Sequence, residues 1–306
     1  MIENTQASKQ PSTGEFLDIK KYIGVASVNV VAINPNNDKL RMYGWNIPED
    51  ADDPVYVKTF EKDGKQQQMT RVRFLVQIQD LEGKPVTYLD FICKPEFAQN
   101  NPEPGSGKPK KWKIIDAYGR TAWATKEEIE AKKIPQYSNG PANISTPYKI
   151  AHPGEEELIA FLYKYLNITP LQIFDRQKNN WVNTTNPGRL TIDRWKDICE
   201  GNMKELAEYV ALQPQNCVKV VFGVQTTDDN KTYQSFLNTG YIGNGSRVNA
   251  ATGEYDAARR LIDKYYANRD QSQYSFSAEP VKEWTVTATH VEDNSSLEPQ
   301  PDDLPW

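Results

Sequence analysis

The sequence has few of the residues on which disulfides, metal centres and histidine-based catalysis depend. It contains 3 cysteines and 2 histidines among 306 residues. Cys93, Cys199 and Cys217 are far apart and form no CxxC pair, so a reducing compartment is indicated and a structural zinc is not expected. His152 and His290 leave little room for catalysis by histidine. The composition therefore predicts a protein that is not an enzyme and that holds no metal or other cofactor.

Long hydrophobic runs are also absent from the sequence. No run approaches the roughly 20 apolar residues that a helix needs to cross a bilayer. Residues 1–21 are polar and lack the apolar segment of a signal peptide. We therefore expect a soluble, cytoplasmic protein with no membrane partner.

The sequence contains no complete phosphate-binding loop. Residues 105–108 match the end of that motif, but Pro102 stands in the place of its first glycine. Pro109 stands where a serine or threonine should hold magnesium. The carboxylates show no spacing that singles out a two-metal nuclease site, so a nuclease is the least favoured alternative.

The net charge of −5 is not spread evenly along the chain. Residues 291–306 contain no base, and their acids are Glu292, Asp293, Glu298, Asp302 and Asp303. These acids account for the whole net charge, which leaves residues 1–290 neutral. A neutral body can hold a basic groove if its acids lie elsewhere, so the charge does not exclude a nucleic-acid partner.

Residues 71–79 carry the clearest strand pattern, because apolar side chains alternate with basic and polar ones. A turn separates this run from residues 86–93, which we expect to pair with it as a hairpin. In that pairing Tyr88 lies near Arg73 on the outer face, beside Arg71. The three side chains would form a stacking platform with a phosphate clamp. The alternative is an ordinary polar outer face.

The order of the predicted elements is strands, helices, strands, helix and tail. This order predicts an α+β fold, in which a small β-barrel is interrupted by a helical insertion. The expected segments are a flexible, disordered arm (1–20), the first part of the β-domain (21–124), a mainly helical insertion (125–215), the remaining strands with a closing helix (216–278), and a linker with an acidic tail (279–306). Helices are expected at 125–133, 155–166, 191–200, 203–212 and 254–267.

Residues 108–113 interleave lysines with an aromatic side chain, and the same theme continues downstream. Binding of single strands needs cations that follow the phosphates and flat rings that face unstacked bases. The candidate residues are Lys108, Lys110, Lys111, Trp112, Lys113, Tyr118, Arg120 and Trp123. The alternative is a solvated basic loop from which Trp112 dips into the core.

The last residues form an acidic segment that leads into a short apolar tip. They are Asp302, Asp303, Leu304, Pro305 and Trp306. Such a tip suits a small apolar socket with a basic rim on a partner protein, because the indole fills the socket and the aspartates steer the approach. The tip resembles that of bacterial and phage single-stranded DNA-binding proteins, in which acids, an aliphatic residue and a proline precede a terminal aromatic.

The resemblance implies an OB-fold barrel that binds single-stranded DNA without sequence preference. Such a protein coats and protects DNA in replication, recombination and repair, and its tip recruits partner proteins of these processes. The acidic tail would also compete weakly with DNA for the basic groove. The large insertion fits the bigger phage binders better than the compact bacterial tetramer, so no oligomeric state is inferred.

Two rival interpretations remain open at the level of sequence. An annealing or recombination-mediator protein would carry the same tail and would stimulate pairing of complementary strands. An interaction or virion protein would dock through the acidic terminus and would not bind DNA at all.

Overall fold

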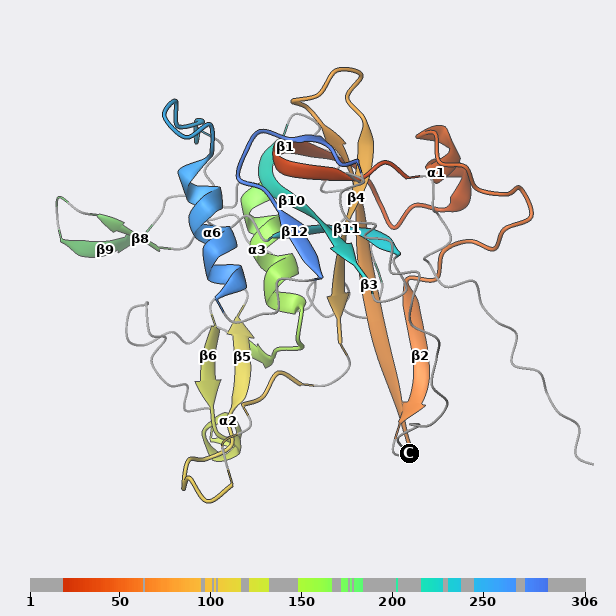
Figure 1. The fold of residues 1–306 in the computed structure, drawn as a ribbon. Helices are drawn as coiled ribbons and strands as arrows, with labels where there is room; N and C mark the ends of the chain where they lie inside the picture. Colours follow the sequence, from red (N-terminus) through yellow and green to blue (C-terminus); the bar gives the residue numbers. More distant parts are fainter. Residues whose placement is uncertain are drawn as a thin grey trace, which may run out of the picture.

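The computed structural model describes residues 19–62, 64–94, 97–100, 102, 104–116, 121–131, 148–166, 172–175, 177, 179–183, 202, 216–227, 231–237, 245–267 and 273–285. These residues form a sheet-rich α+β fold, as the sequence predicted (Figure 1). In the part of the chain that the structure describes, no helix is long and apolar enough to cross a membrane.

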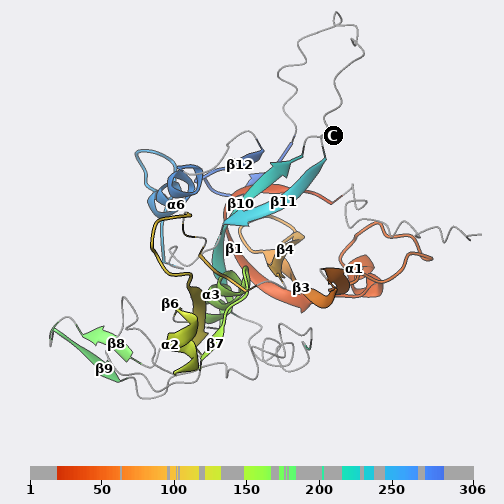
Figure 2. The same ribbon diagram turned by 90° about the horizontal axis from the view of Figure 1, so that it is seen from below.

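The main sheet is antiparallel and strongly curved (Figure 2). Its principal strands are β1 (Tyr22–Ile33), β3 (Lys65–Ile78), β4 (Val86–Cys93), β10 (Val218–Thr226) and β11 (Thr232–Leu237). Shorter strands extend it, namely β2 (Val57–Lys62) on β3, β12 (Tyr274–Phe276) on β10 and β13 (Lys282–Glu283) on β1. The order β10-β1-β3-β4 is that of a Greek key. No described residues of β4 and β11 pair, so the sheet curls without closing.

The predicted hairpin of residues 71–79 and 86–93 is confirmed, with Arg73 opposite Asp90 and Leu75 opposite Tyr88. Strand β3 nevertheless begins earlier, at Lys65, and its first half pairs with β2. The sequence pattern missed this extension because residues 65–68 are all polar and show no apolar alternation.

A second, smaller sheet lies below α3 and α6, at the lower left of Figure 1. It contains β5 (Trp112–Asp116), β6 (Thr121–Ala124) and β7 (Tyr148–Ile150) in the order β6-β5-β7. Helix α2 (Lys126–Glu130) follows β6 within the range 125–133 that the sequence predicted, and Thr125 and Glu128 form a capping box at its start. A separate two-stranded ribbon consists of β8 (Gln172–Asp175) and β9 (Asn180–Asn183).

Helix α3 (Glu155–Tyr165) packs into the interior of the main sheet. The Phe161 ring centre lies 5.1 Å from that of Phe74 on β3 and 5.2 Å from that of Phe91 on β4. Tyr165 accepts a hydrogen bond from the Val30 backbone nitrogen at 3.0 Å. Phe161 and Tyr165 therefore serve packing, and their contacts make α3 part of the β-domain core.

The expected boundary between residues 21–124 and 125–215 falls inside the small sheet, which contains strands from both segments. Strand β7 lies in the second segment but pairs with β5 in the first. The helices expected at 191–200 and 203–212 lie outside the described residues, as do residues 1–18 and 286–306. The closing helix is present as α6 (Asp256–Tyr266), and its buried Ala258 and Ile262 cover the outer side of β1 and β10.

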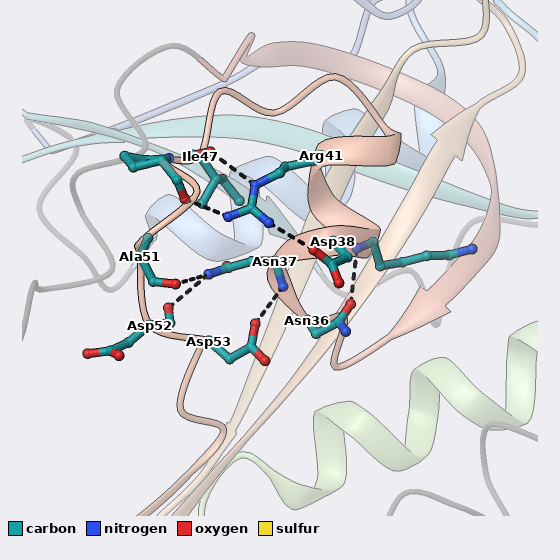
Figure 3. Close-up of polar contacts among 10 residues, drawn as sticks. Asn36, Asn37, Asp38, Arg41, Ile47, Ala51, Asp52 and Asp53 are labelled. Carbon is teal, nitrogen blue, oxygen red and sulfur yellow. Dashed lines mark hydrogen bonds and ion pairs between the residues drawn. The ribbon is translucent and has the colours of Figure 1, made fainter.

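A polar network fixes the loop that follows α1 (Asn37–Met42), as Figure 3 shows. The Asn37 side-chain nitrogen donates to the Ala51 carbonyl oxygen at 2.8 Å, and Arg41 Nε donates to the Ile47 carbonyl oxygen at 3.1 Å. Trp45 and Ile47 are consequently held in a buried cluster with Leu75. The loop thus covers part of the outer face of β3.

Gly154 lets α3 begin close to the end of β4. Its φ is +90°, and a Cβ placed there would lie 1.9 Å from the Ile92 carbonyl oxygen. We expect Gly154→Ala to lower the free energy of unfolding by about 3 kcal/mol, because alanine adds both left-handed strain and a clash with backbone. Chemical denaturation followed by circular dichroism measures this loss.

Gly83→Ala is the matched control for that experiment. Gly83 has a φ of +71° but open space around it. Its replacement should cost only about 1 kcal/mol, from the backbone strain alone. Equal losses for the two variants would show that the close approach of α3 to Ile92 does not matter.

Candidate nucleic-acid interface

The pleat of β5 divides the predicted basic and aromatic segment between two faces of the small sheet. Successive side chains on a strand point to opposite faces, so Trp112 and Lys113 are turned apart. Lys113 lies directly opposite Trp123 on β6 and shares its face. Ile114 and Ile115 accordingly belong to different hydrophobic clusters. The candidate residues therefore form two separate groups. We call the group of Lys113 and Trp123 the Lys113 face, and the group of Trp112 and Lys110 the Trp112 face.

On the Lys113 face, a cation lies beside an exposed ring. Lys113 Nζ is 5.6 Å from the centre of the Trp123 ring, and Trp123 is 41% exposed. Lys113 also forms an ion pair with Glu156 of α3. The Glu156 carboxylate already neutralises this ammonium group, so the exposed Trp123 ring, which can stack on an unpaired base, is the stronger feature of this face.

On the Trp112 face, Lys110 Nζ lies 5.7 Å from the centre of the Trp112 ring. Lys108 and Lys110 are exposed, whereas Lys111 and Trp112 are half-buried. The backbone nitrogen of Lys111 donates to the Asn100 side-chain oxygen at 2.6 Å, which anchors the segment where it enters β5. Trp112 is thus partly buried without belonging to a core cluster, and the alternative of a solvated basic loop is compatible with this arrangement.

The Trp112 face includes a second aromatic pair that the sequence did not indicate. Phe97 is 48% exposed, and its ring centre lies 5.0 Å from that of His152 at an interplanar angle of 33°. Neither residue belongs to a periodic pattern. Residues 95–110 are rich in proline, glycine, asparagine and lysine, which predicts a loop, and His152 precedes a Pro-Gly turn. A large aromatic residue among polar neighbours was the only available signal.

Two of the predicted residues cannot be placed in this interface. Tyr118 and Arg120 lie outside the described residues, between β5 and β6. Their contribution stays a prediction. The tip residues Asp302, Asp303, Leu304, Pro305 and Trp306 also lie outside the described residues.

The expectation that Arg73 lies on an exposed outer face is wrong. Arg73 is 3% exposed, and its guanidinium donates to both Asp90 carboxylate oxygens, with Nε at 2.7 Å and Nη2 at 2.6 Å. Burial alone would lower the pKa of Arg73, but the hydrogen bond and charge of Asp90 outweigh it and raise the pKa. The guanidinium therefore neutralises the Asp90 carboxylate and is not accessible to a phosphate at the surface.

The expected closeness of Tyr88 and Arg73 is confirmed, but their setting is a packed one. The Arg73 guanidinium carbon lies 4.5 Å from the centre of the Tyr88 ring, and Trp45 contacts that ring edge-on at 5.9 Å. Burial raises the pKa of the Tyr88 hydroxyl, and the Arg73 charge opposes this only in part. Arg71 is half-buried with its Nε 3.8 Å from Asp90 Oδ2. The loop after α1 thus covers much of the predicted platform.

A groove of about 760 Å³ lies where β4, β11, α3 and α6 meet. Three of its lining side chains are acids, Asp90, Glu156 and Glu157, and Lys264 is its one lysine among the described residues. Carboxylates repel phosphates, so this groove does not suit a nucleic-acid backbone. The exposed lysines that precede β5 make the small sheet a more favourable position for a nucleic-acid backbone.

The chain was also compared with known proteins. No family model, curated protein or solved structure matches it.

Proposed function

We propose that the chain binds single-stranded DNA without sequence preference through the two faces of the β6-β5-β7 sheet. The observation that carries the proposal is the pair of cation–aromatic contacts, Lys113 with Trp123 and Lys110 with Trp112. Lysines neutralise phosphates and rings stack on unpaired bases, and neither contact reads base edges. A duplex offers phosphates but no free base faces, so the single strand is favoured. The protein coats and protects such strands during replication, recombination and repair, without catalysing a reaction.

We further propose an OB-like architecture for the main sheet. An OB-fold is a five-stranded, partly open Greek-key barrel, and β10-β1-β3-β4 follows the Greek-key order. Strand β11 lies beside β4 without pairing with it among the described residues, and the ring centres of Phe91 and Phe236 lie 5.1 Å apart across this opening, which fits a partly open barrel. OB-folds use the outer face of their second and third strands for binding. Here those strands are β3 and β4, and the loop after α1 covers that face, so the contact surface shifts to the small sheet.

The resemblance of residues 302–306 to the tips of single-stranded DNA-binding proteins supports a further part of the proposal. The acidic tail recruits replication and recombination proteins, and the charge contrast with the lysines of the small sheet makes it a weak competitor of DNA.

A hairpin oligonucleotide with a fluorophore and a quencher at its ends tests this function. Binding to unpaired bases removes hairpins from the equilibrium, so added protein should raise the fluorescence, and a matched blunt duplex should not bind. A hairpin that stays closed at every protein concentration would contradict the proposal and favour the interaction or virion protein. Accelerated pairing of complementary strands would favour the annealing protein.

Trp123→Ala should weaken binding to oligo-dT about tenfold, because removal of one stacked base contact costs about 1–3 kcal/mol. Trp123→Phe keeps a flat ring at this position and should lose threefold or less. Fluorescence anisotropy of labelled oligo-dT measures both affinities. Wild-type affinity in Trp123→Ala would remove this ring from the interface.

A further inference from the structure

Phe97 and His152 lie on the same face of the small sheet as Trp112. Gln99 is bridged to Trp112 across the edge of β5, and Phe97 is two residues before Gln99. His152 is two residues after Ile150, which is opposite Ile114. Residues two apart on extended backbone point to the same side.

The backbone next to Phe97 is anchored by hydrogen bonds to β5 and to the segment that follows β7. The Ala98 nitrogen donates to the Ala151 carbonyl oxygen at 2.8 Å, and the Lys113 nitrogen donates to the Ala98 carbonyl oxygen at 2.8 Å. The Lys94 nitrogen donates to the Pro153 carbonyl oxygen at 3.1 Å. These hydrogen bonds therefore anchor the chain at Ala98, next to Phe97, and at Lys94 before it.

The backbone of His152 is also anchored by hydrogen bonds, at the start of α3. Its backbone nitrogen donates to a carboxylate oxygen of Glu155 at 2.9 Å, and its carbonyl oxygen accepts from the Glu155 nitrogen at 3.2 Å. Glu155 is fully buried and forms an ion pair with Lys149. The backbone that carries the imidazole is thus anchored, and the imidazole lies against the Phe97 ring at 5.0 Å between ring centres.

An aromatic ring that remains 48% exposed on an anchored backbone is poorly explained by packing alone. Lys94, Lys108 and Lys110 are all exposed on the segments that precede and follow the ring in the chain. An apolar partner surface would have to desolvate these lysines, whereas a nucleotide supplies both a flat base and a phosphate to them. The chemistry therefore favours a nucleotide over a hydrophobic protein partner.

Resting on the proposed function, we propose that Phe97, backed by His152, is a base-stacking position that takes one unpaired nucleobase of the strand bound at Trp112. Two residues along extended backbone span about 7 Å, so the two stacking positions are close enough for bases of one short strand. The lysines beside them hold the intervening phosphates. The site does not discriminate among bases, because every base has a face that can stack.

The test compares two oligonucleotides of equal length, oligo-dT and a strand of abasic sites that keeps the phosphates but lacks the bases. Phe97→Ala should weaken binding of oligo-dT about tenfold and change binding of the abasic strand less than twofold. Phe97→Tyr retains the flat ring and should bind oligo-dT like the wild type. Met42→Ala removes an exposed apolar side chain elsewhere, on α1, and should have no effect.

Two outcomes would overturn the stacking position while leaving the proposed function intact. One is wild-type affinity of Phe97→Ala for oligo-dT when Trp123→Ala is weakened. The other is an equal loss on both oligonucleotides, which would show a general effect on the surface. If the wild-type protein does not prefer oligo-dT to the abasic strand, base stacking fails altogether and the proposed function falls with it.

Discussion

Replacing Asp90 with alanine is expected to lower the free energy of unfolding by about 4 kcal/mol, because it leaves the buried Arg73 charge without its partner. The Arg73 guanidinium is 3% exposed and forms both of its hydrogen bonds to the Asp90 carboxylate at 2.6–2.7 Å. Arg71 also lies near that carboxylate, with Nε at 3.8 Å, so the variant would bring two guanidinium groups together without an acid between them. Urea denaturation monitored by circular dichroism measures the loss.

Asp38→Ala is the matched control for this variant. Asp38 forms an ion pair with Arg41 at 2.9 Å, but its side chain is 84% exposed. Exposed pairs contribute little, so this variant should change stability by about 0.5 kcal/mol or less. The double variant Arg73→Met with Asp90→Leu removes both charges and should recover more than half of the loss. A loss in Asp90→Ala no larger than that in Asp38→Ala would contradict a structural role for the pair.

Changing Lys108, Lys110 and Lys111 together to glutamine should weaken binding of oligo-dT about 100-fold at moderate salt. Each phosphate contact that is lost removes the release of its counterion, which lowers the slope of log affinity against log salt by about 0.7 for a single strand. Three lost contacts should therefore reduce the slope by about 2. Anisotropy titrations at four or five salt concentrations give both the affinity and the slope.

The control for net charge changes three exposed lysines on other elements, namely Lys20 before β1, Lys264 on α6 and Lys282 on β13. This variant has the same net charge as the first one, so it isolates position from total charge. It should keep the wild-type slope and lose affinity by threefold or less. A slope that falls equally in both variants would show that phosphates are not bound at residues 108–111.

Elements with a regular apolar period could be predicted from the sequence. The alternation in residues 71–79 identified β3 and its pairing with β4, and the spacing of Leu158, Phe161 and Leu162 identified α3. Thr125 and Glu128 identified the start of α2, because the capping box is a local contact between near neighbours. In each case the signal lies within a few residues of the element itself.

Features that depend on contacts between distant segments could not be predicted in this way. The polar face of β3 gave no sign that the loop carrying Trp45 and Ile47 would cover it, since that cover depends on the contacts of Asn37 and Arg41. Burial of Arg73 follows from this cover and from Asp90 across the hairpin. A period-2 pattern shows which side chains share a face but not whether the face is solvated.

The candidate interface illustrates the same limit. The sequence placed Lys110 to Lys113 in one basic and aromatic patch, whereas the pleat of β5 turns Trp112 and Lys113 to opposite faces. Pairing of Trp123 with Lys113 could have been anticipated only from the register of β5 and β6. Phe97 and His152 meet because two segments flank the same edge of β5, and no local pattern encodes that meeting.

The most direct test of the account is a titration of tryptophan fluorescence with oligo-dT and with a matched duplex, repeated across a salt series. The chain contains 7 tryptophans, and rings that stack on bases lose fluorescence. We expect quenching by oligo-dT that saturates and weakens steeply as salt rises, and little quenching by the duplex. Absence of quenching by oligo-dT in dilute buffer, or equal quenching by both ligands, would contradict single-strand binding at the small sheet.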